Sequence, residues 1–215
     1  MATAETEPTS TRRTQTERRA EAEQRLLLAA RKIVARKGWV GMTLAEVGEA
    51  AGYSRGLAAH HFGNKAGLLR ALAGFVNTSF MDLVKAAPKR RPGLDTLKGF
   101  VSVYLGRKES DWVNTRALLA LMAEAVTEDS ETAEILAEYN RSVQSYLARH
   151  VSEGIAKGEI RVDVDPLAAA ALILGAMRGM MMQFLLDPTA VDLAILQKQL
   201  IAFVDSALDA SGPAI

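Results

Sequence analysis

Apolar residues recur at intervals of three and four along most of this 215-residue chain, and this is the period of an amphipathic helix. Glycine, proline and helix-capping residues interrupt the pattern and divide it into about nine predicted helices. No segment shows the strict alternation of apolar and polar residues that predicts a strand, and no internal repeat is evident. The sequence therefore predicts an all-α protein.

Two short helices are predicted to meet at a glycine turn. Thr43 and Glu46 have the spacing of a capping box, in which a hydroxyl and a carboxylate satisfy backbone donors at a helix start. Gly52 can leave this helix with positive φ, and Ser54 is predicted to cap the next helix, which ends near Phe62. Two helices joined by such a tight turn form a helix-turn-helix, whose second helix places its first residues in the DNA major groove.

Longer helices surround this motif. A first helix runs from about Thr16 to Gly38; a fourth from Asn64 to Pro88; a fifth from about Asp95; a sixth from about Asp111 to Val126; a seventh from Ser130 to near Gly158; an eighth from Asp165 and Pro166; and a ninth, after Pro188, ends near Ala210. The first three helices are expected to form a head, and the fourth links this head to the body.

Charge is distributed unevenly along the chain. The net charge is only +1, but residues 1–70 carry 12 Lys or Arg against 7 Asp or Glu. Contact with a polyanion is therefore expected in the first third of the chain. The absence of cysteine excludes a disulfide framework and a thiolate nucleophile. The longest apolar run, residues 167–177, is too short to span a bilayer and no signal peptide is visible, so we expect a cytoplasmic protein that does not enter a membrane.

The motif resembles the N-terminal domain of the tetracycline-repressor (TetR) family of bacterial transcription regulators. The matching residues, in the family's order and spacing, are Thr43, Ala51-Gly52, Ser54-Arg55-Gly56, His61-Phe62 and Lys65. The close resemblance covers roughly residues 20–75. Ala59 stands where the family commonly has an aromatic residue, usually tyrosine, so the phosphate or base contact made there is open in this chain.

The position of each residue in the motif suggests a role on double-stranded DNA. Arg55 is expected to donate a bidentate pair of hydrogen bonds to guanine, and Leu57 and Ala58 to contact thymine methyl groups. Gly56 is expected to allow close approach of the backbone to DNA. The candidate phosphate contacts are Thr43, Ser54, His60, His61 and Lys65.

The body carries apolar and aromatic residues with scattered polar groups, as a small-molecule cavity requires. The candidates are Phe80, Tyr104, Trp112, Arg116, Met122, Tyr139, Asn140, Tyr146, Met177, Arg178 and Met181. Met177 and Met181 are equally well explained as core packing, and Arg116 or Arg178 either pairs with an anionic ligand or forms an internal salt bridge. The resemblance implies that an unidentified inducer binds between these helices, moves the fourth helix and releases the protein from a palindromic operator.

The last two helices are the candidate dimer interface. The eighth is apolar around most of its circumference, and Gly175, Ala176 and Gly179 would let another helix approach closely. The ninth has leucine and valine at spacings of three and four. Two copies of this pair can bury both helices in a homodimer, as the resemblance also implies, although the same helices can instead complete a monomer core.

These observations predict four segments: a disordered arm over residues 1–14, a helix-turn-helix domain over 15–63, a ligand-binding and dimerisation domain over 64–210, and a tail over 211–215. No nucleophile and base at a recognisable spacing, metal-ligand cluster or phosphate-binding loop is evident, so we expect neither an enzyme nor a cofactor. The predicted function is a TetR-like transcription regulator, and we expect a repressor rather than an activator. The alternative is a helical ligand-binding protein whose DNA recognition is degenerate.

Overall fold

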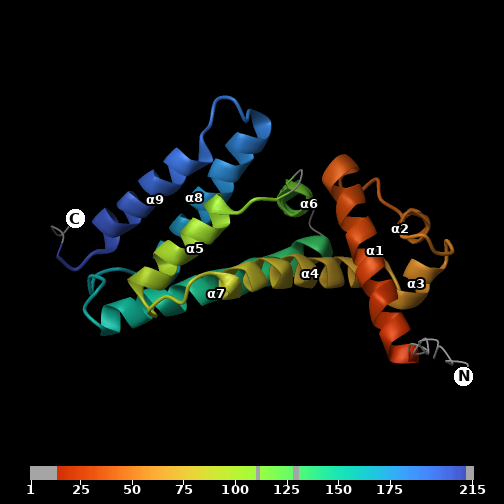
Figure 1. The fold of residues 1–215 in the computed structure, drawn as a ribbon, viewed down its shortest axis with the longest axis horizontal. Coiled ribbons are helices and arrows are strands. Elements are labelled where there is room, and N and C mark those ends of the chain that lie inside the picture. Colours follow the sequence, from red (N-terminus) through yellow and green to blue (C-terminus); the bar gives the residue numbers. More distant parts are fainter. Residues whose placement is uncertain (1–13, 110–111, 128–130, 212–215) are drawn as a thin grey trace, which may run out of the picture.

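The computed structural model describes residues 14–109, 112–127 and 131–211, and within these ranges the chain forms nine helices and one isolated β-bridge, between Ile160 and Asp209. The helices are α1 (Gln15–Lys37), α2 (Leu44–Ala50), α3 (Leu57–Phe62), α4 (Lys65–Ala86), α5 (Leu94–Gly106), α6 (Val113–Thr127), α7 (Glu131–Ala156), α8 (Pro166–Leu186) and α9 (Leu193–Leu208). The predicted all-α fold is confirmed (Figure 1). Most of the predicted arm and tail, and the predicted helix starts at Asp111 and Ser130, lie outside the described residues.

Side-chain caps begin several helices where the sequence predicts them. The side chain of Asn64 accepts from the N–H of Gly67 at 2.8 Å at the start of α4, and Asp165 caps α8 just before Pro166. Thr43 accepts from the N–H of Glu46 at 3.2 Å. The Glu46 carboxylate, however, pairs with Lys37 at 2.6 Å, so only the threonine half of the predicted capping box is formed.

The predicted N-cap at Ser54 is wrong. Helix α3 begins at Leu57 with Gly56 as its cap, and the turn before it is closed by the Leu57 N–H, which donates to the Ser54 carbonyl at 3.1 Å. The reason lies in α2, where an added Cβ on Gly48 would lie 2.5 Å from that carbonyl oxygen. This close packing holds the segment that follows Gly52 against α2, and Gly52 itself makes the turn with a φ of +80°. Helix α3 therefore begins only at Leu57.

Two hydrophobic cores hold the molecule together. The first joins α1, α2, α3 and the first half of α4 to apolar residues of α6 and α7, among them Leu118, Leu121 and Leu136. The second joins α5, α7, α8 and α9. Helices α4 and α7 lie side by side and connect the two regions (Figure 1). The core of the head therefore extends past residue 63 and includes part of the body.

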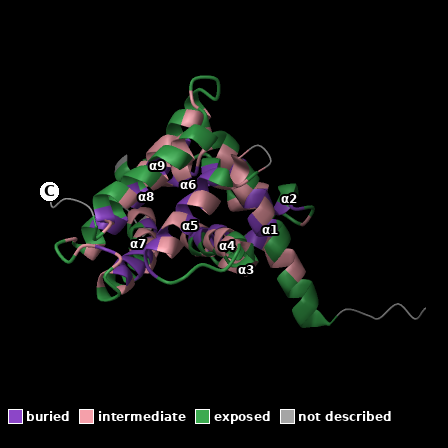
Figure 2. Ribbon diagram, turned by 60° about the vertical axis from the view of Figure 1, so that its left-hand side comes forward, coloured by how far each residue is buried: buried purple, intermediate pink, exposed green. Residues whose placement is uncertain are grey.

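Helix α8 separates a buried face from an exposed one. Ala170, Ile173 and Met177 pack into the second core, whereas Leu167, Leu172 and Leu186 are exposed. The whole helix, unlike the run at residues 167–177, is long and apolar enough to cross a membrane by length and composition, and about a third of its most apolar window is buried. Figure 2 shows the exposed and half-exposed surface of α8 and α9 on the outer side of the fold.

Candidate nucleic-acid interface and ligand cavity

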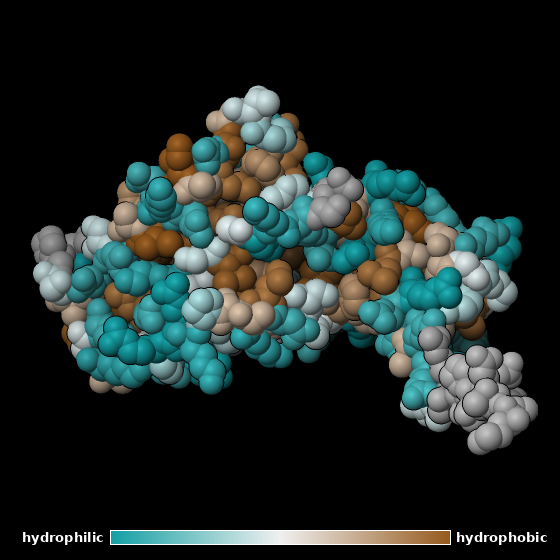
Figure 3. Space-filling view, in the orientation of Figure 1, coloured by the Kyte–Doolittle hydropathy of each residue, from teal (hydrophilic) through white to brown (hydrophobic). Residues whose placement is uncertain are grey.

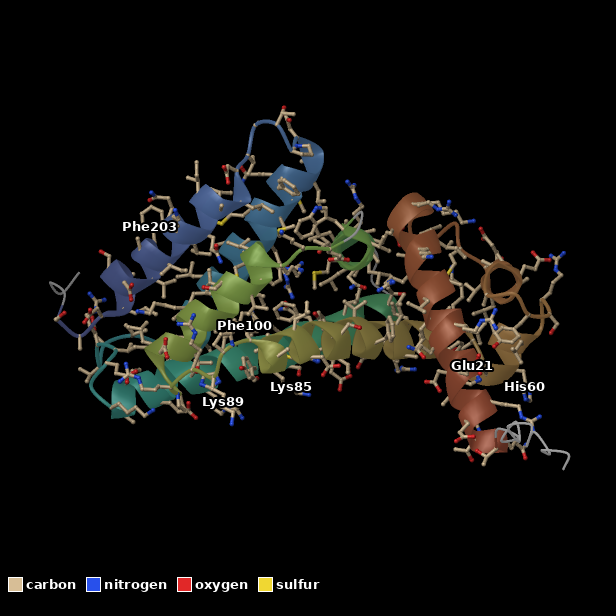
Figure 4. The ribbon with its side chains drawn as sticks, viewed as in Figure 1. Glu21, His60, Lys85, Lys89, Phe100 and Phe203 are labelled. Carbon is tan, nitrogen blue, oxygen red and sulfur yellow. The ribbon has the colours of Figure 1, made fainter. Side chains whose placement is uncertain are left out.

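The turn into α3 presents a polar surface to solvent. Ser54, Arg55, Gly56, Ala59 and His60 are all exposed. The Arg55 side chain is 76% exposed, and its nearest acidic partner is Glu49 of α2, at 3.5 Å from its Nε. An exposed ion pair of this length is weak, so the guanidinium is available to a base edge or a phosphate. His60 lies on the outer side of α3 (Figure 4). Thr43 is exposed at the start of α2.

Three predicted contacts of α3 are wholly or partly buried in the protein. Ala58 is 0% exposed and belongs to the core of the head, so it presents no free methyl surface to DNA, whereas Leu57 packs against that core and is half-buried. The His61 side chain is 9% exposed and its Nε2 lies 3.1 Å from the Glu23 carboxylate of α1. The contact of His61 with Glu23 therefore holds α3 against α1. The sequence had instead predicted that His61 contacts a DNA phosphate.

Lys65 also has a structural position. Its Nζ donates to the carbonyls of Trp39 and Val40, at 2.9 and 3.3 Å, and lies 5.0 Å from the centre of the Trp39 ring. The ammonium at the start of α4 thus holds the loop between α1 and α2. Sequence reasoning instead assigned this charge to a phosphate.

Arg25 of α1 was missed by the sequence analysis. It is exposed, its guanidinium lies 4.9 Å from the centre of the Tyr53 ring, and an added Cβ on Gly52 would lie 3.1 Å from it. It therefore adds a positive charge beside the turn. The excess of basic residues in the first third of the chain is the only sequence signal for it.

A cavity of about 460 Å³ lies between α4, α5, α6, α7 and α8. Figure 3 shows apolar side chains around a hollow between α4, α5 and α6. The aromatic lining residues are Phe80, Phe100, Tyr104, Tyr139 and Tyr146, and the charged ones are Arg107, Lys108, Glu109 and Arg178. Its volume lies within the range of about 300–1,000 Å³ that is usual for small-molecule sites.

The predicted ligand residues divide into three groups. Phe80, Tyr104, Tyr139, Tyr146 and Arg178 line the cavity. Met177 and Met181 are fully buried in the second core, Met122 packs against the first, and Arg116 is exposed on α6. Asn140 and Trp112 do not line the cavity but contact residues that do, since Asn140 accepts from Arg178, and the Arg107 guanidinium lies over the Trp112 ring.

The connection between α5 and α6 carries a charged cluster that the sequence analysis missed. The Arg107 guanidinium lies 4.4 Å from the centre of the Tyr104 ring and 5.6 Å from those of Phe80 and Trp112. It donates to the Thr115 hydroxyl at 2.6 Å, and its Nε lies 3.7 Å from Glu109. Because these residues lie in a loop, no helical period marked them as inward-facing.

Glu109 links the cavity to the start of α6. Its carboxylate accepts from the Thr115 hydroxyl at 3.1 Å and from the backbone N–H of Asn114. The Asn114 side-chain oxygen in turn accepts from Arg31 of α1 at 2.6 Å. Burial lowers the pKa of Arg31, and the negative charge of Glu109 opposes that shift. A continuous set of polar contacts therefore joins the cavity wall to the first helix of the head.

Tyr104, which is buried, and Tyr139, which is half-buried, remain protonated at neutral pH. Burial raises the pKa of Tyr104 and of Tyr139, although the neighbouring guanidinium groups of Arg107 and Arg178 partly oppose the shift. Both phenols can thus donate a hydrogen bond into the cavity. Within the described part of the chain, no group of three or more histidine, aspartate or glutamate side chains is arranged to hold a metal ion.

A surface-exposed helix-turn-helix on an all-helical body that encloses a cavity defines the class of helix-turn-helix regulators. The family model described as "Bacterial regulatory proteins, tetR family" matches residues 26–72, and the model described as "BetI-type transcriptional repressor, C-terminal" matches residues 93–209, more than half of the chain. The chain belongs to the TetR family of DNA-binding transcription regulators.

Curated relatives agree with this assignment. The HTH-type transcriptional repressor AcnR of Corynebacterium glutamicum is 28% identical over 145 residues, which cover 66% of this chain and 70% of AcnR. The HTH-type transcriptional regulator CymR of Pseudomonas putida is 47% identical over 60 residues, which cover 28% of this chain and only 30% of CymR. Both are helix-turn-helix regulators by name.

Solved structures share the fold. A TetR-family transcriptional regulator from Rhodococcus sp. has a TM-score of 0.77 at 23% identity, over 88% of this chain and 100% of that one. A transcriptional regulator from Saccharomonospora viridis, solved in complex with choline, has a TM-score of 0.72 at 19% identity, over 88% of this chain and 98% of that one. At these identities the similarity establishes the fold alone.

Proposed function

We propose that the protein is a homodimeric, cytoplasmic repressor that binds a palindromic DNA operator and leaves it when a small molecule occupies the cavity. It acts by binding, with no catalytic step. The observation that carries this proposal is the contact between Asn114, on the cavity wall, and Arg31 of the head at 2.6 Å. A ligand that displaces the start of α6 changes the position of α1, and with it that of α3.

The geometry of the operator sets the requirement for release. Two recognition helices of a dimer fit successive major grooves only when their centres are about 34–36 Å apart. A ligand that favours any other spacing lowers the affinity for DNA, because it binds one conformation of the protein more tightly than the other. The proposal therefore needs two copies of the chain and, within each copy, a rigid connection between the cavity and α3.

The exposed surface of α8 and α9 supports the dimer. Leu172 is 75% exposed on α8, and Phe203, which Figure 4 labels, is 65% exposed on α9. These two helices line a groove of about 450 Å³. An added Cβ on Gly175 or Gly179 would meet no atom within 4 Å, so the glycine positions of α8 are open to a second helix. Pairing of α8 and α9 with the same helices of a second copy buries this surface in a four-helix contact.

Selection of bound sequences from a random duplex pool, with purified protein at near-physiological salt, tests the proposal. An enriched palindrome is the expected result, because a twofold dimer reads two half-sites. Binding without enrichment that disappears as the salt concentration rises would instead identify a degenerate head, since counterion release alone gives no sequence preference. That result would favour a ligand-binding protein without operator recognition, a reading for which Ala59 provides a reason.

A further inference from the structure

We propose that the cavity binds a small organic monocarboxylate with an apolar or aromatic body, and that Arg178 binds its carboxylate. This inference rests on the proposed function, in which the cavity is the effector site. It specifies the chemical class of the effector, which the family assignment leaves open.

The first observation is the environment of Arg178 on α8. One terminal nitrogen of its guanidinium donates to the side-chain oxygen of Asn140. The guanidinium also lies close enough to the phenols of Tyr104 and Tyr139 for its charge to affect their pKa values. Its Nε is buried and has no hydrogen-bond partner. No carboxylate of the described residues forms an ion pair with this guanidinium. A guanidinium that is partly withdrawn from water is normally paired, so a half-buried cation with neutral neighbours and an unused donor favours an anion.

The second observation is the charge of the cavity lining. Arg107, Lys108 and Arg178 contribute three positive charges, and Glu109 is the one carboxylate among the described lining residues. Its oxygens already accept from Thr115 and from the backbone of Asn114, and one of them lies 3.7 Å from Arg107. Arg107 is therefore compensated, and Arg178 keeps an uncompensated charge beside walls of low polarity, which strengthen its attraction for an anion.

The third observation disfavours a cationic ligand. A group of three aromatic rings suits an ammonium ion, and Phe80, Tyr104 and Trp112 form such a group. Here the guanidinium of Arg107 already lies over all three rings, at 4.4 to 5.6 Å from their centres. An ammonium ligand such as choline would have to displace this charge and would then lie in a positively charged cavity.

The remaining walls define the body of the ligand. Phe100, Tyr146 and Leu174 are apolar or aromatic lining residues, so they favour a hydrocarbon chain or ring over a sugar or a nucleotide. Tyr104 and Tyr139 stay protonated at neutral pH and can donate to the carboxylate beside Arg178. A guanidinium fork with two phenol donors matches the planar, two-oxygen geometry of a carboxylate.

Calorimetric titration of the full-length, DNA-free protein tests the inference with matched probes. Octanoate and benzoate represent the proposed class, octanamide has the same chain without the charge, and octyltrimethylammonium and choline carry the opposite charge. The expected result is that octanoate binds about tenfold or more tightly than octanamide, because an ionised hydrogen bond is stronger than a neutral one. The two ammonium probes should bind more weakly than octanamide.

Two variants assign the preference to a residue. In Arg178→Gln the preference for octanoate over octanamide should disappear. Arg149→Gln is the matched control, because Arg149 is an exposed arginine of α7 that does not line the cavity although it lies over the Tyr146 ring. It removes the same charge from the same domain and should keep the preference. If Arg178→Gln does not fold, Arg178→Lys should reduce the preference without abolishing it, because an ammonium retains the charge but cannot bind a carboxylate through two parallel bonds.

Three outcomes would overturn the inference. The first is that an ammonium probe binds more tightly than octanoate, and the second is that the Arg178 variant keeps the full preference for octanoate over octanamide. The third is no heat of binding for either carboxylate at about 5 mM, where a ligand of millimolar affinity saturates the site. The test needs no DNA, so it is separate from the operator selection. Carboxylate binding without an enriched operator would reject the proposed function alone. An enriched operator without carboxylate binding would reject only the ligand class.

Discussion

The loop between α1 and α2 is held from two sides, and Glu124 of α6 provides the contact from the body. Its carboxylate oxygens accept from the N–H of Trp39 at 2.8 and 2.9 Å and from the N–H of Val40 at 3.4 Å. Lys65 holds the carbonyls of the same two residues. Gly38 has φ of +78°, and an added Cβ there would lie 2.5 Å from the Glu124 carboxylate. The loop backbone therefore wraps around this acid.

Glu124→Gln tests this contact at nearly constant shape. One oxygen becomes an amide NH₂ group, which cannot accept and faces backbone donors, and the remaining hydrogen bonds lose their charge. The loss should be roughly 1.5–3 kcal/mol of unfolding free energy, the usual worth of hydrogen bonds to a charged group. For a chain of this length each kcal/mol lowers Tm by about 2–4 °C, so a decrease of about 3–12 °C is expected.

Thermal unfolding at fixed protein concentration measures this decrease. Glu138→Gln is the control, because Glu138 is an exposed carboxylate on the neighbouring helix α7. Operator affinity should also fall in Glu124→Gln, since the position of the head depends on the same loop. A Tm within about 1 °C of the wild-type value would refute the assignment of Glu124 as an anchor of the head, because changes this small are typical of surface substitutions.

Three further predictions concern the recognition turn, the dimer and pH. Arg55→Ala should cost roughly 1–3 kcal/mol of operator binding and relax the preference at one base pair; titration of sequence variants measures this, and a uniform loss over all sequences would contradict base reading. Phe203→Asp should give monomers in light scattering at micromolar concentration, because a charge in an apolar interface is left unpaired; a persistent dimer would place the interface elsewhere. The pKa of Asp95 lies below its ordinary value of 3.8 because its carboxylate accepts from the Arg91 N–H and then from Arg90. Its ionised form therefore stabilises the fold above that pH, and the contribution is lost as the pH falls through the lower pKa of the folded state. Asp95→Asn should unfold more easily at pH 7 and lose less stability below about pH 4 in urea titrations, whereas parallel pH curves for the two proteins would exclude this contribution.

The sequence predicted the helices well because their signals are local. A run of apolar positions at spacings of three and four, a capping side chain such as Asn64 and a glycine such as Gly52 act within a few residues of the structure they determine. The prediction failed at Ser54, where the start of the helix depends on packing against Gly48. That contact joins two helices, and a capping pattern within one helix does not report it.

The cavity was predicted in part. Phe80 and Tyr104, which were predicted to contact a ligand, do line the cavity, because large apolar side chains on inward faces have few other places to lie. Arg107 and Glu109 were missed, because a loop has no period that shows which side chains turn inward. The sequence left open whether Met177 and Met181 contact a ligand or pack in the core, and the structure places both in the core of the body.

The sequence by itself determined that the chain is helical, that its first third is basic and that a helix-turn-helix stands there, because period, charge and turn residues are properties of neighbouring positions. Only the tertiary structure decided which residues of that motif face outward, since Ala58 and His61 are turned inward by contacts with residues of other helices. It alone also joined the cavity to the head through Asn114 and Arg31. That contact spans 83 positions of the chain, and its formation depends on how α1 packs on α6.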